Sequence, residues 1–280
     1  MTDPAEGSAS PLSTGGAPAP VSAALQASGF PFQTAIEHVI RKTHEWGVLG
    51  IEFPWRDSAD GDQFLDLVAG SGRFVAGVEC KKTQKEKLTF LLPQGTKAVT
   101  VDRARLLYAS QIRDSTRRWE LFCSTWRVAP ASYESAFCVV STSESGKDQR
   151  MLERDVGRLI LGTDAYARYA AKRLAVSSAD EPGRPYVPVL VTNAPLFVAR
   201  YEPTEVCLDT GEFSTPPKDI AAVHWVRFRK SFPSHGGRDL GERTTFIVTA
   251  ARLAQFLVEL SQTLPAEPTD MSDRAHLPKD

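Results

Sequence analysis

Apolar residues recur at helical spacing in three segments of the chain. The first runs from Pro31 to Glu45, with proline in its first turn and Gly47 just beyond its end, positions that these two residues favour. Residues 152–174 and 250–264 show the same one-sided pattern. A further helix is predicted between residues 101 and 118, where apolar residues mix with five arginines.

Shorter apolar runs between these segments predict extended structure. The predicted strands are residues 48–55, 64–69, 74–81, 88–92, 136–141, 186–192, 195–201, 206–208, 222–230 and 244–248. Turn-forming residues 70–72 join strands 64–69 and 74–81 into a hairpin, and Asn193-Ala194 predicts a second hairpin. Strands mixed with helices favour an α/β or mixed α+β fold, with one central sheet flanked by helices.

The ends of the chain have a different composition from its middle. Residues 1–27 are rich in Ser, Ala, Gly and Pro, and residues 264–280 are polar with three prolines, so both predict disordered tails. Between them we expect a core over residues 28–180. A strand-rich segment over residues 181–263 would pack on it, either extending the same sheet or forming a small companion unit.

Composition narrows the class of protein. A formal net charge of −1 excludes a globally basic nucleic-acid-binding protein but allows a local basic face. The four cysteines are scattered without a CxxC pair, which disfavours a zinc site and indicates reduced thiols. No apolar run reaches about 18 residues, and the first residues lack the features of a secretory signal. We therefore expect a soluble cytoplasmic protein without membrane association.

The strand that ends in Glu79-Cys80-Lys81 carries the most informative pattern. Residues i and i+2 of a strand share a face, so Glu79 and Lys81 project together. The opposite face carries only apolar residues and a thiol, namely Phe74, Ala76, Val78 and Cys80. That face is the predicted core face, which leaves the acid and the lysine for chemistry.

Asp66 lies between Leu65 and Leu67 on the other strand of this hairpin, where an acid is unusual. A short turn would bring it beside Glu79. Two adjacent carboxylates repel each other unless a cation neutralises them, and Mg²⁺ or Mn²⁺ takes oxygen ligands. A nearby lysine can orient water or stabilise charge on a phosphate. The pattern predicts metal-dependent hydrolysis of a phosphodiester bond; the alternative is a solvated Glu–Lys pair at a strand end.

The helix starting near Gly29-Phe30-Pro31 and the later stretch FLDLVAGSGRFVAGVECKK resemble the PD-(D/E)xK, or restriction-endonuclease-like, superfamily. The resemblance covers residues 28–92 and extends toward the helix at 152–174. It implies an αβββαβ core around a mixed sheet, and nucleic acid, with DNA expected, as the substrate. It also implies Asp66 and Glu79 as metal ligands and Lys81 as the catalytic lysine.

The chain departs from that family pattern at two positions. Many members carry a glutamate in the first helix that helps to hold metal, but Gln33 occupies that position here. Glu37, one turn further on, is an alternative metal ligand or an exposed helix charge. Leu65 replaces the proline that precedes the family's aspartate. The number of metal ions stays open, and so does a second hypothesis, a nucleic-acid-binding module that has lost its chemistry.

Basic residues after the hairpin suggest where nucleic acid would bind. Cations can neutralise phosphates, although interleaved acids also fit a solvated helix face. The predicted nucleic-acid-binding residues are Lys82, Lys85, Lys87, Arg103, Arg105 and the amide of Gln33. The segment 181–263 is expected to select substrate or to form a homodimer contact.

Overall fold

The computed structural model describes residues 19–57, 61–72, 74–83, 86–94, 102–111, 119–141, 149–176, 183–231 and 241–263. Its helices are α1 (Ala19–Ala27), α2 (Phe30–Lys42), α3 (Gln149–Val176) and α4 (Leu253–Ser261). Short 3₁₀ segments, η1 (Pro203–Glu205) and η2 (Ala250–Arg252), accompany them. The described residues form a mixed α/β structure with two sheets, so the predicted fold class is confirmed at this level.

Nine strands build the larger sheet. They are β1 (Gly47–Asp57), β2 (Gly61–Gly70), β3 (Val75–Lys81), β5 (Arg103–Gln111), β6 (Trp119–Arg127), β7 (Glu134–Ser135), β9 (Arg184–Thr192), β12 (Trp225–Ser231) and β13 (Glu242–Thr249). The order is β1-β2-β3-β9-β13-β12-β7, and β5 pairs with β9 and β6. Strands β1, β2 and β3 form an antiparallel meander, whereas β9 lies parallel to β3. Along the chain, α2 is followed by β1, β2 and β3, and after β4 to β8 come α3 and β9.

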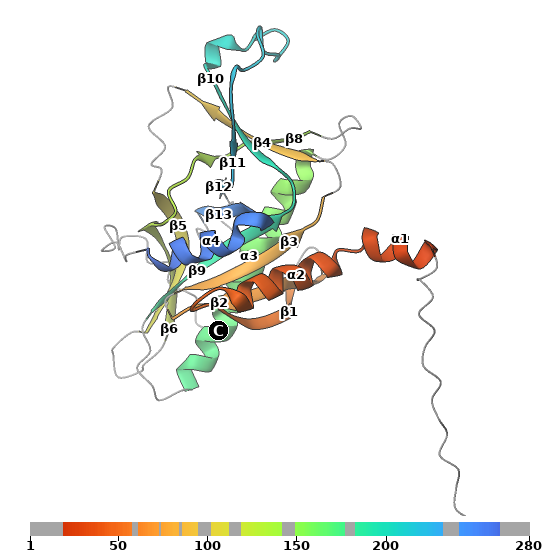
Figure 1. Cartoon of the computed structure of the whole chain (residues 1–280). Coiled ribbons are helices and arrows are strands. Elements are labelled where there is room, and N and C mark those ends of the chain that lie inside the picture. The colour runs from red at the N-terminus through yellow and green to blue at the C-terminus, as the bar shows by residue number, and fades with distance from the viewer. Residues whose placement is uncertain are drawn as a thin grey trace, which may run out of the picture.

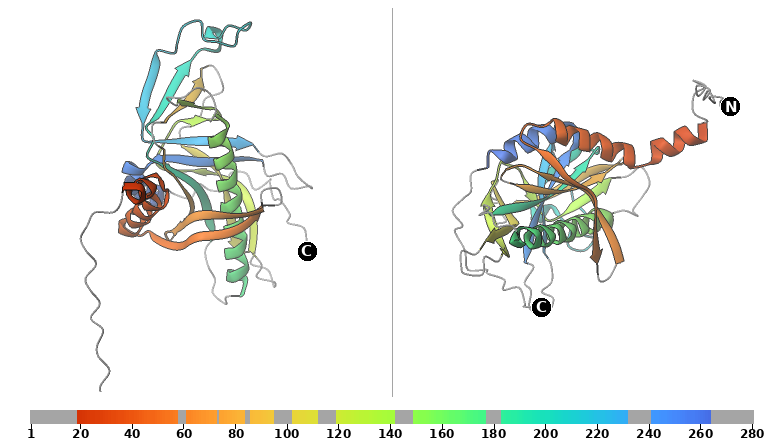
Figure 2. Two further views of the ribbon diagram at one scale, coloured as in Figure 1. Left: turned by 90° about the vertical axis from the view of Figure 1, so that its right-hand side faces the viewer. Right: turned by 90° about the horizontal axis from the view of Figure 1, so that it is seen from below.

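Helices cover both faces of this sheet. Helices α2 and α4 lie on one face and α3 crosses the other (Figure 1). Ile36, Ile40 and Phe256 belong to the core under α2 and α4, and Val156 and Ile160 to the core under α3. Helix α1 continues from α2 away from the sheets (Figure 2). The predicted core face of β3 is confirmed, because Phe74, Ala76 and Val78 are buried in the α2–α4 core.

Strand β3 lies directly against α3 because Gly77 has no side chain. A Cβ at this position would overlap the Thr163 hydroxyl oxygen on α3. We expect Gly77→Ala to lower the free energy of unfolding by about 2 kcal/mol, since overpacking a buried contact costs about 1–3 kcal/mol. Gly72→Ala is the matched control, because a Cβ there would have no neighbour within 4 Å. Equal thermal stability of the two variants would contradict this account of the β3–α3 contact.

Four strands form a second sheet that the sequence did not indicate. These are β4 (Lys87–Pro93), β8 (Cys138–Ser141), β10 (Leu196–Tyr201) and β11 (Asp219–Val223), in the order β11-β10-β4-β8. The predicted β9–β10 hairpin is wrong, because β9 and β10 belong to different sheets. Asn193 lies between them and hydrogen-bonds the backbone of Thr83 in both directions, at 2.6 and 2.8 Å. This contact fixes the chain where it leaves one sheet for the other.

Two further expectations need correction. Residues 103–111 form a strand, β5, rather than a helix. Residues 19–27 of the expected disordered tail form α1, while residues 1–18 and 264–280 lie outside the described residues. The segment 181–263 supplies β9, β12 and β13 to the main sheet, and β10 and β11 to the second sheet. Among the described helices, none is long and apolar enough to cross a membrane.

Candidate active site

Asp66 and Glu79 lie side by side where β2 and β3 separate. The last pair in register is Leu67 with Val78, so the next residues along the two strands are Asp66 and Glu79. The ladder stops there, and Asp66 Oδ2 accepts a hydrogen bond from the Cys80 backbone N–H at 2.7 Å. The structure thus brings the two predicted acids together, with the Asp66 carboxylate fixed against β3.

Lys81 points from β3 toward α3. Its Nζ lies 2.8 Å from Asp155 Oδ2, and the Asp155 side chain is only 11% exposed. Glu79 and Lys81 share the face of β3 on which Gly77 meets Thr163 of α3. Sequence reasoning missed Asp155, because an acid near the start of a helix has no pattern that marks a strand partner 74 residues earlier.

Glu52 on β1 is a third acid of the site that the sequence analysis did not single out. It lies across from Asp66, between the pairs Ile51–Leu67 and Phe53–Leu65. Its φ of 50° lies in the left-handed region, which costs a non-glycine residue about 1–2 kcal/mol. The clue used for Asp66, an acid between two large apolar residues, also applies to Glu52 and was available in the sequence.

Gln33 joins α2 to these strands. Its side-chain Nε2 donates to Glu52 Oε1 at 2.5 Å and to the Asp66 backbone oxygen at 3.2 Å, and the residue is buried. Gln33 is therefore the α2 residue that contacts the site, and Glu52 brings a carboxylate to the side of the site that faces α2. Glu37, the alternative acid, is instead paired with Arg41 one turn later on α2, at 2.7 Å.

The site holds more acid than its lysine neutralises. Burial, reinforced by Asp66 and then by Asp155, raises the pKa of Glu79 to about 8. Burial also raises the pKa of Asp66 to about 6, against the lowering effect of the hydrogen bond from Cys80. Repulsion from Glu52 also raises the pKa of both carboxyls, whereas the positive charge of Lys81 lowers both. A divalent cation would relieve this repulsion.

The donor set fits a hard divalent cation. Among the described residues, no three His, Cys, Asp or Glu side chains form a closed metal-binding group. Mg²⁺ does not need one, since it is usually held by one or two carboxylates and keeps several waters. Asp66 and Glu79 supply two such carboxylates. The Cys80 thiol does not compete as a ligand, because burial raises its pKa and metals bind the thiolate form.

The structure places the predicted nucleic-acid-binding residues in different surroundings. Lys82 donates its Nζ protons to the carbonyls of Gln26 and Ser28, and so ties down the junction of α1 and α2. Lys87 is exposed at the start of β4 in the second sheet, and Lys85 lies outside the described residues. Lys82 is therefore engaged at the α1–α2 junction, and Lys87 belongs to the second sheet.

Arg103 and Arg105 lie on β5, not on a helix. Strand β5 joins β9 through Leu107 and Tyr186, and Tyr186 pairs with Val75 at the start of β3. Lys81 is at the other end of β3, roughly 20 Å away at about 3.3 Å per residue. The residues of β5 that pair with β9 therefore lie near the start of β3, whereas the acids lie near its end.

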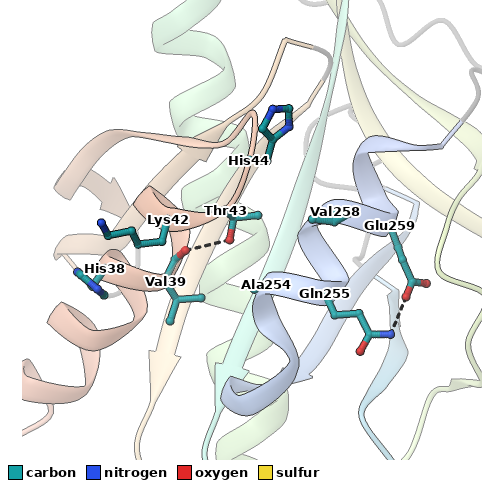
Figure 3. Close-up of a pocket in the computed structure, with 9 residues that line it drawn as sticks. All are labelled: His38, Val39, Lys42, Thr43, His44, Ala254, Gln255, Val258 and Glu259. Atoms are coloured by element: carbon teal, nitrogen blue, oxygen red, sulfur yellow. Dashed lines mark hydrogen bonds between the residues drawn. The ribbon is translucent and has the colours of Figure 1, made fainter.

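A groove of about 680 Å³ lies elsewhere, between α2 and α4 (Figure 3). Its lining residues are His38, Val39, Lys42, Thr43, His44, Ala254, Gln255, Val258 and Glu259. Asp66, Glu79 and Lys81 do not line it, and Glu79 and Lys81 face α3 on the other side of the sheet. This groove is not the place where the predicted chemistry would occur.

Comparisons with models of protein families, with curated proteins and with solved structures found no match to this chain.

Proposed function

We propose that this protein is a Mg²⁺- or Mn²⁺-dependent nuclease that hydrolyses phosphodiester bonds in DNA. One observation carries the proposal: Asp66, Glu79 and Lys81, chosen from the sequence for this chemistry, meet at the point where β2 and β3 separate. Asp66 is held there by the Cys80 N–H at 2.7 Å, and Lys81 by Asp155 at 2.8 Å. Such fixed positions are what a catalytic group requires.

The course of the chain supports the finer fold assignment. The order α2-β1-β2-β3-α3-β9, with β9 parallel to β3, is the αβββαβ order expected of a PD-(D/E)xK core. Strands β4 to β8 would then be an insertion between β3 and α3, and β10 to β13 with α4 an addition after β9. In this arrangement the two acids and the lysine occupy the second and third core strands, as the resemblance implies.

Each residue has a defined part in the proposed reaction. Asp66 and Glu79 would hold the metal ion, which supplies polarisation of a phosphoryl oxygen and a bound water of lowered pKa. The Asp66 oxygen bonded to Cys80 fixes the carboxylate, and its other oxygen is the one available to the metal. Lys81, as an ammonium donor, orients the attacking water or stabilises charge that develops on the phosphate.

A cleavage assay tests the proposal. Supercoiled plasmid and labelled single- and double-stranded oligonucleotides are incubated with Mg²⁺, with Mn²⁺ or with EDTA. We expect cleavage with either ion and none with EDTA. Glu37→Gln is a control that should keep full activity, because Glu37 pairs with Arg41 on α2. Cleavage in EDTA at the same rate would contradict the metal requirement.

A second function is favoured by one observation, the amide of Gln33 at the position where many family members place an acid. Gln33 donates to Glu52, so that part of the site is occupied by a hydrogen bond rather than by an open carboxylate. In this case the fold would bind nucleic acid without cutting it. Salt-dependent binding without cleavage under any metal condition would favour this alternative over the nuclease.

A further inference from the structure

The solvent-facing side of α3 carries a row of basic residues. Arg154, Arg158, Tyr169 and Lys172 follow one another at spacings of 4, 11 and 3 residues, which places them on one side of a helix with 3.6 residues per turn. Arg173 flanks the row, one turn beyond Tyr169. We call these five residues the outer face of α3. It contains four cations in a chain whose formal net charge is −1, and the acids Glu153 and Asp155 flank Arg154 at its first turn.

The row begins one residue before Asp155, the α3 partner of Lys81. Arg154 is the neighbour of Asp155, which holds Lys81 at 2.8 Å. From Arg154 the row runs to Arg173, a distance of about 28 Å at 1.5 Å per residue. A strand bound along this row would pass Arg154, the chain neighbour of the Asp155 that holds Lys81.

Tyr169 supplies a fixed aromatic surface in this row. Its ring lies 5.4 Å from the Phe53 ring and 6.0 Å from the Tyr166 ring. Arg173 lies over the Tyr169 ring, 5.6 Å from its centre, and donates to the Tyr169 hydroxyl at 2.9 Å. Even so, the residue remains 43% exposed. The ring is held in place, with Arg173 over one of its faces, and it keeps exposed surface on which a base could stack.

We propose that the outer face of α3 binds a single-stranded segment of the nucleic-acid substrate. The cations would lie along the phosphates, and Tyr169 would stack on an unpaired base. This inference rests on the proposed function, and it narrows the substrate to nucleic acid with an unpaired stretch. A duplex keeps its bases stacked on one another, so it could use the cations but not the Tyr169 ring. An apolar protein partner would gain nothing from four cations.

Equilibrium binding in EDTA tests the inference without cleavage. A labelled single strand and the corresponding duplex are titrated with the whole protein, with Tyr169→Ala and with Tyr169→Phe. We expect Tyr169→Ala to weaken single-strand binding about tenfold, the size of one base–aromatic stack, and to leave duplex binding nearly unchanged. Tyr169→Phe keeps the ring and should bind as the parent does. Lys172→Ala should weaken binding to both and reduce the salt slope by about 0.7–0.9.

Two matched controls lie away from this helix. Phe30 is an exposed aromatic residue at the start of α2, and Arg252 an exposed cation before α4, both on helices of the opposite face of the sheet. Phe30→Ala and Arg252→Ala should bind as the parent does. Unchanged single-strand binding by Tyr169→Ala, or an equal loss in the two controls, would overturn the inference while leaving the nuclease proposal intact. A parent protein that binds neither nucleic acid would overturn both.

Discussion

Glu79→Gln is expected to make the protein more stable, not less, when no metal is present. In the folded chain, burial and the neighbouring acids Asp66 and Asp155 raise the pKa of Glu79 to about 8, from 4.5. One pKa unit corresponds to 1.36 kcal/mol, so the carboxyl weakens the folded state by on the order of 3–5 kcal/mol at neutral pH and above. Glutamine has a similar shape and no charge. Thermal unfolding in EDTA at pH 8 should therefore shift upward by at least about 5 °C.

The same carboxyl gives this stability a defined pH dependence. Its pKa is raised on folding, so between about pH 4.5 and 8 the unfolded chain releases a proton that the folded chain keeps. The stability that depends on a protonated Glu79 is therefore fully present below pH 4.5, and it is lost as the pH rises through 8. The raised pKa of Asp66 likewise lowers the free energy of unfolding as the pH rises from about 4 to 6. A parent protein with the same unfolding free energy as Glu79→Gln across this range would contradict the crowded-acid account.

Lys81→Met is expected to lower the rate of cleavage by a factor of about 10²–10³, the effect of removing one donor from a developing charge. The measurement is a single-turnover rate in Mg²⁺ at saturating enzyme, so that weaker substrate binding does not change the measured rate. Loss of Lys81 also leaves the buried Asp155 carboxylate without its partner, so the rate should be compared well below the unfolding temperature of the variant.

Lys82→Met is the matched control for this variant. It removes the adjacent lysine, whose Nζ is bound to the carbonyls of Gln26 and Ser28 rather than to an acid of the site. We expect its cleavage rate to stay within about threefold of the parent rate. Similar losses in both variants would mean that general positive charge, and not the position of Lys81, supports the reaction.

The hairpin that carries the proposed chemistry was predictable because its signals are local. The alternation along residues 74–80 set the core face, and a compact turn at residues 70–72 set the register that places Asp66 beside Glu79. Asp155 was not predictable in this way. It reaches Lys81 only because α3 crosses the sheet, and the contact of Gly77 with Thr163 helps to fix that crossing.

The errors arose where tertiary contacts override local patterns. Leu106 and Leu107 are adjacent apolar residues that fit a helix, but in β5 both are buried, because the strand is enclosed by β6, β9 and the layers above and below. Asn193-Ala194 has the composition of a tight turn. Instead, the Asn193 side chain hydrogen-bonds to Thr83 where the chain passes from one sheet to the other. A single sequence does not reveal this contact.

The most direct test of the proposed active site is the Mg²⁺-dependent cleavage rate of Glu79→Gln beside that of the parent protein. The account predicts a variant that unfolds at a higher temperature in EDTA and yet cuts at least about 100-fold more slowly in Mg²⁺, so that the loss cannot be ascribed to a weakened fold. A variant that is stable and cuts at the parent rate would show that Glu79 does not hold the reacting metal.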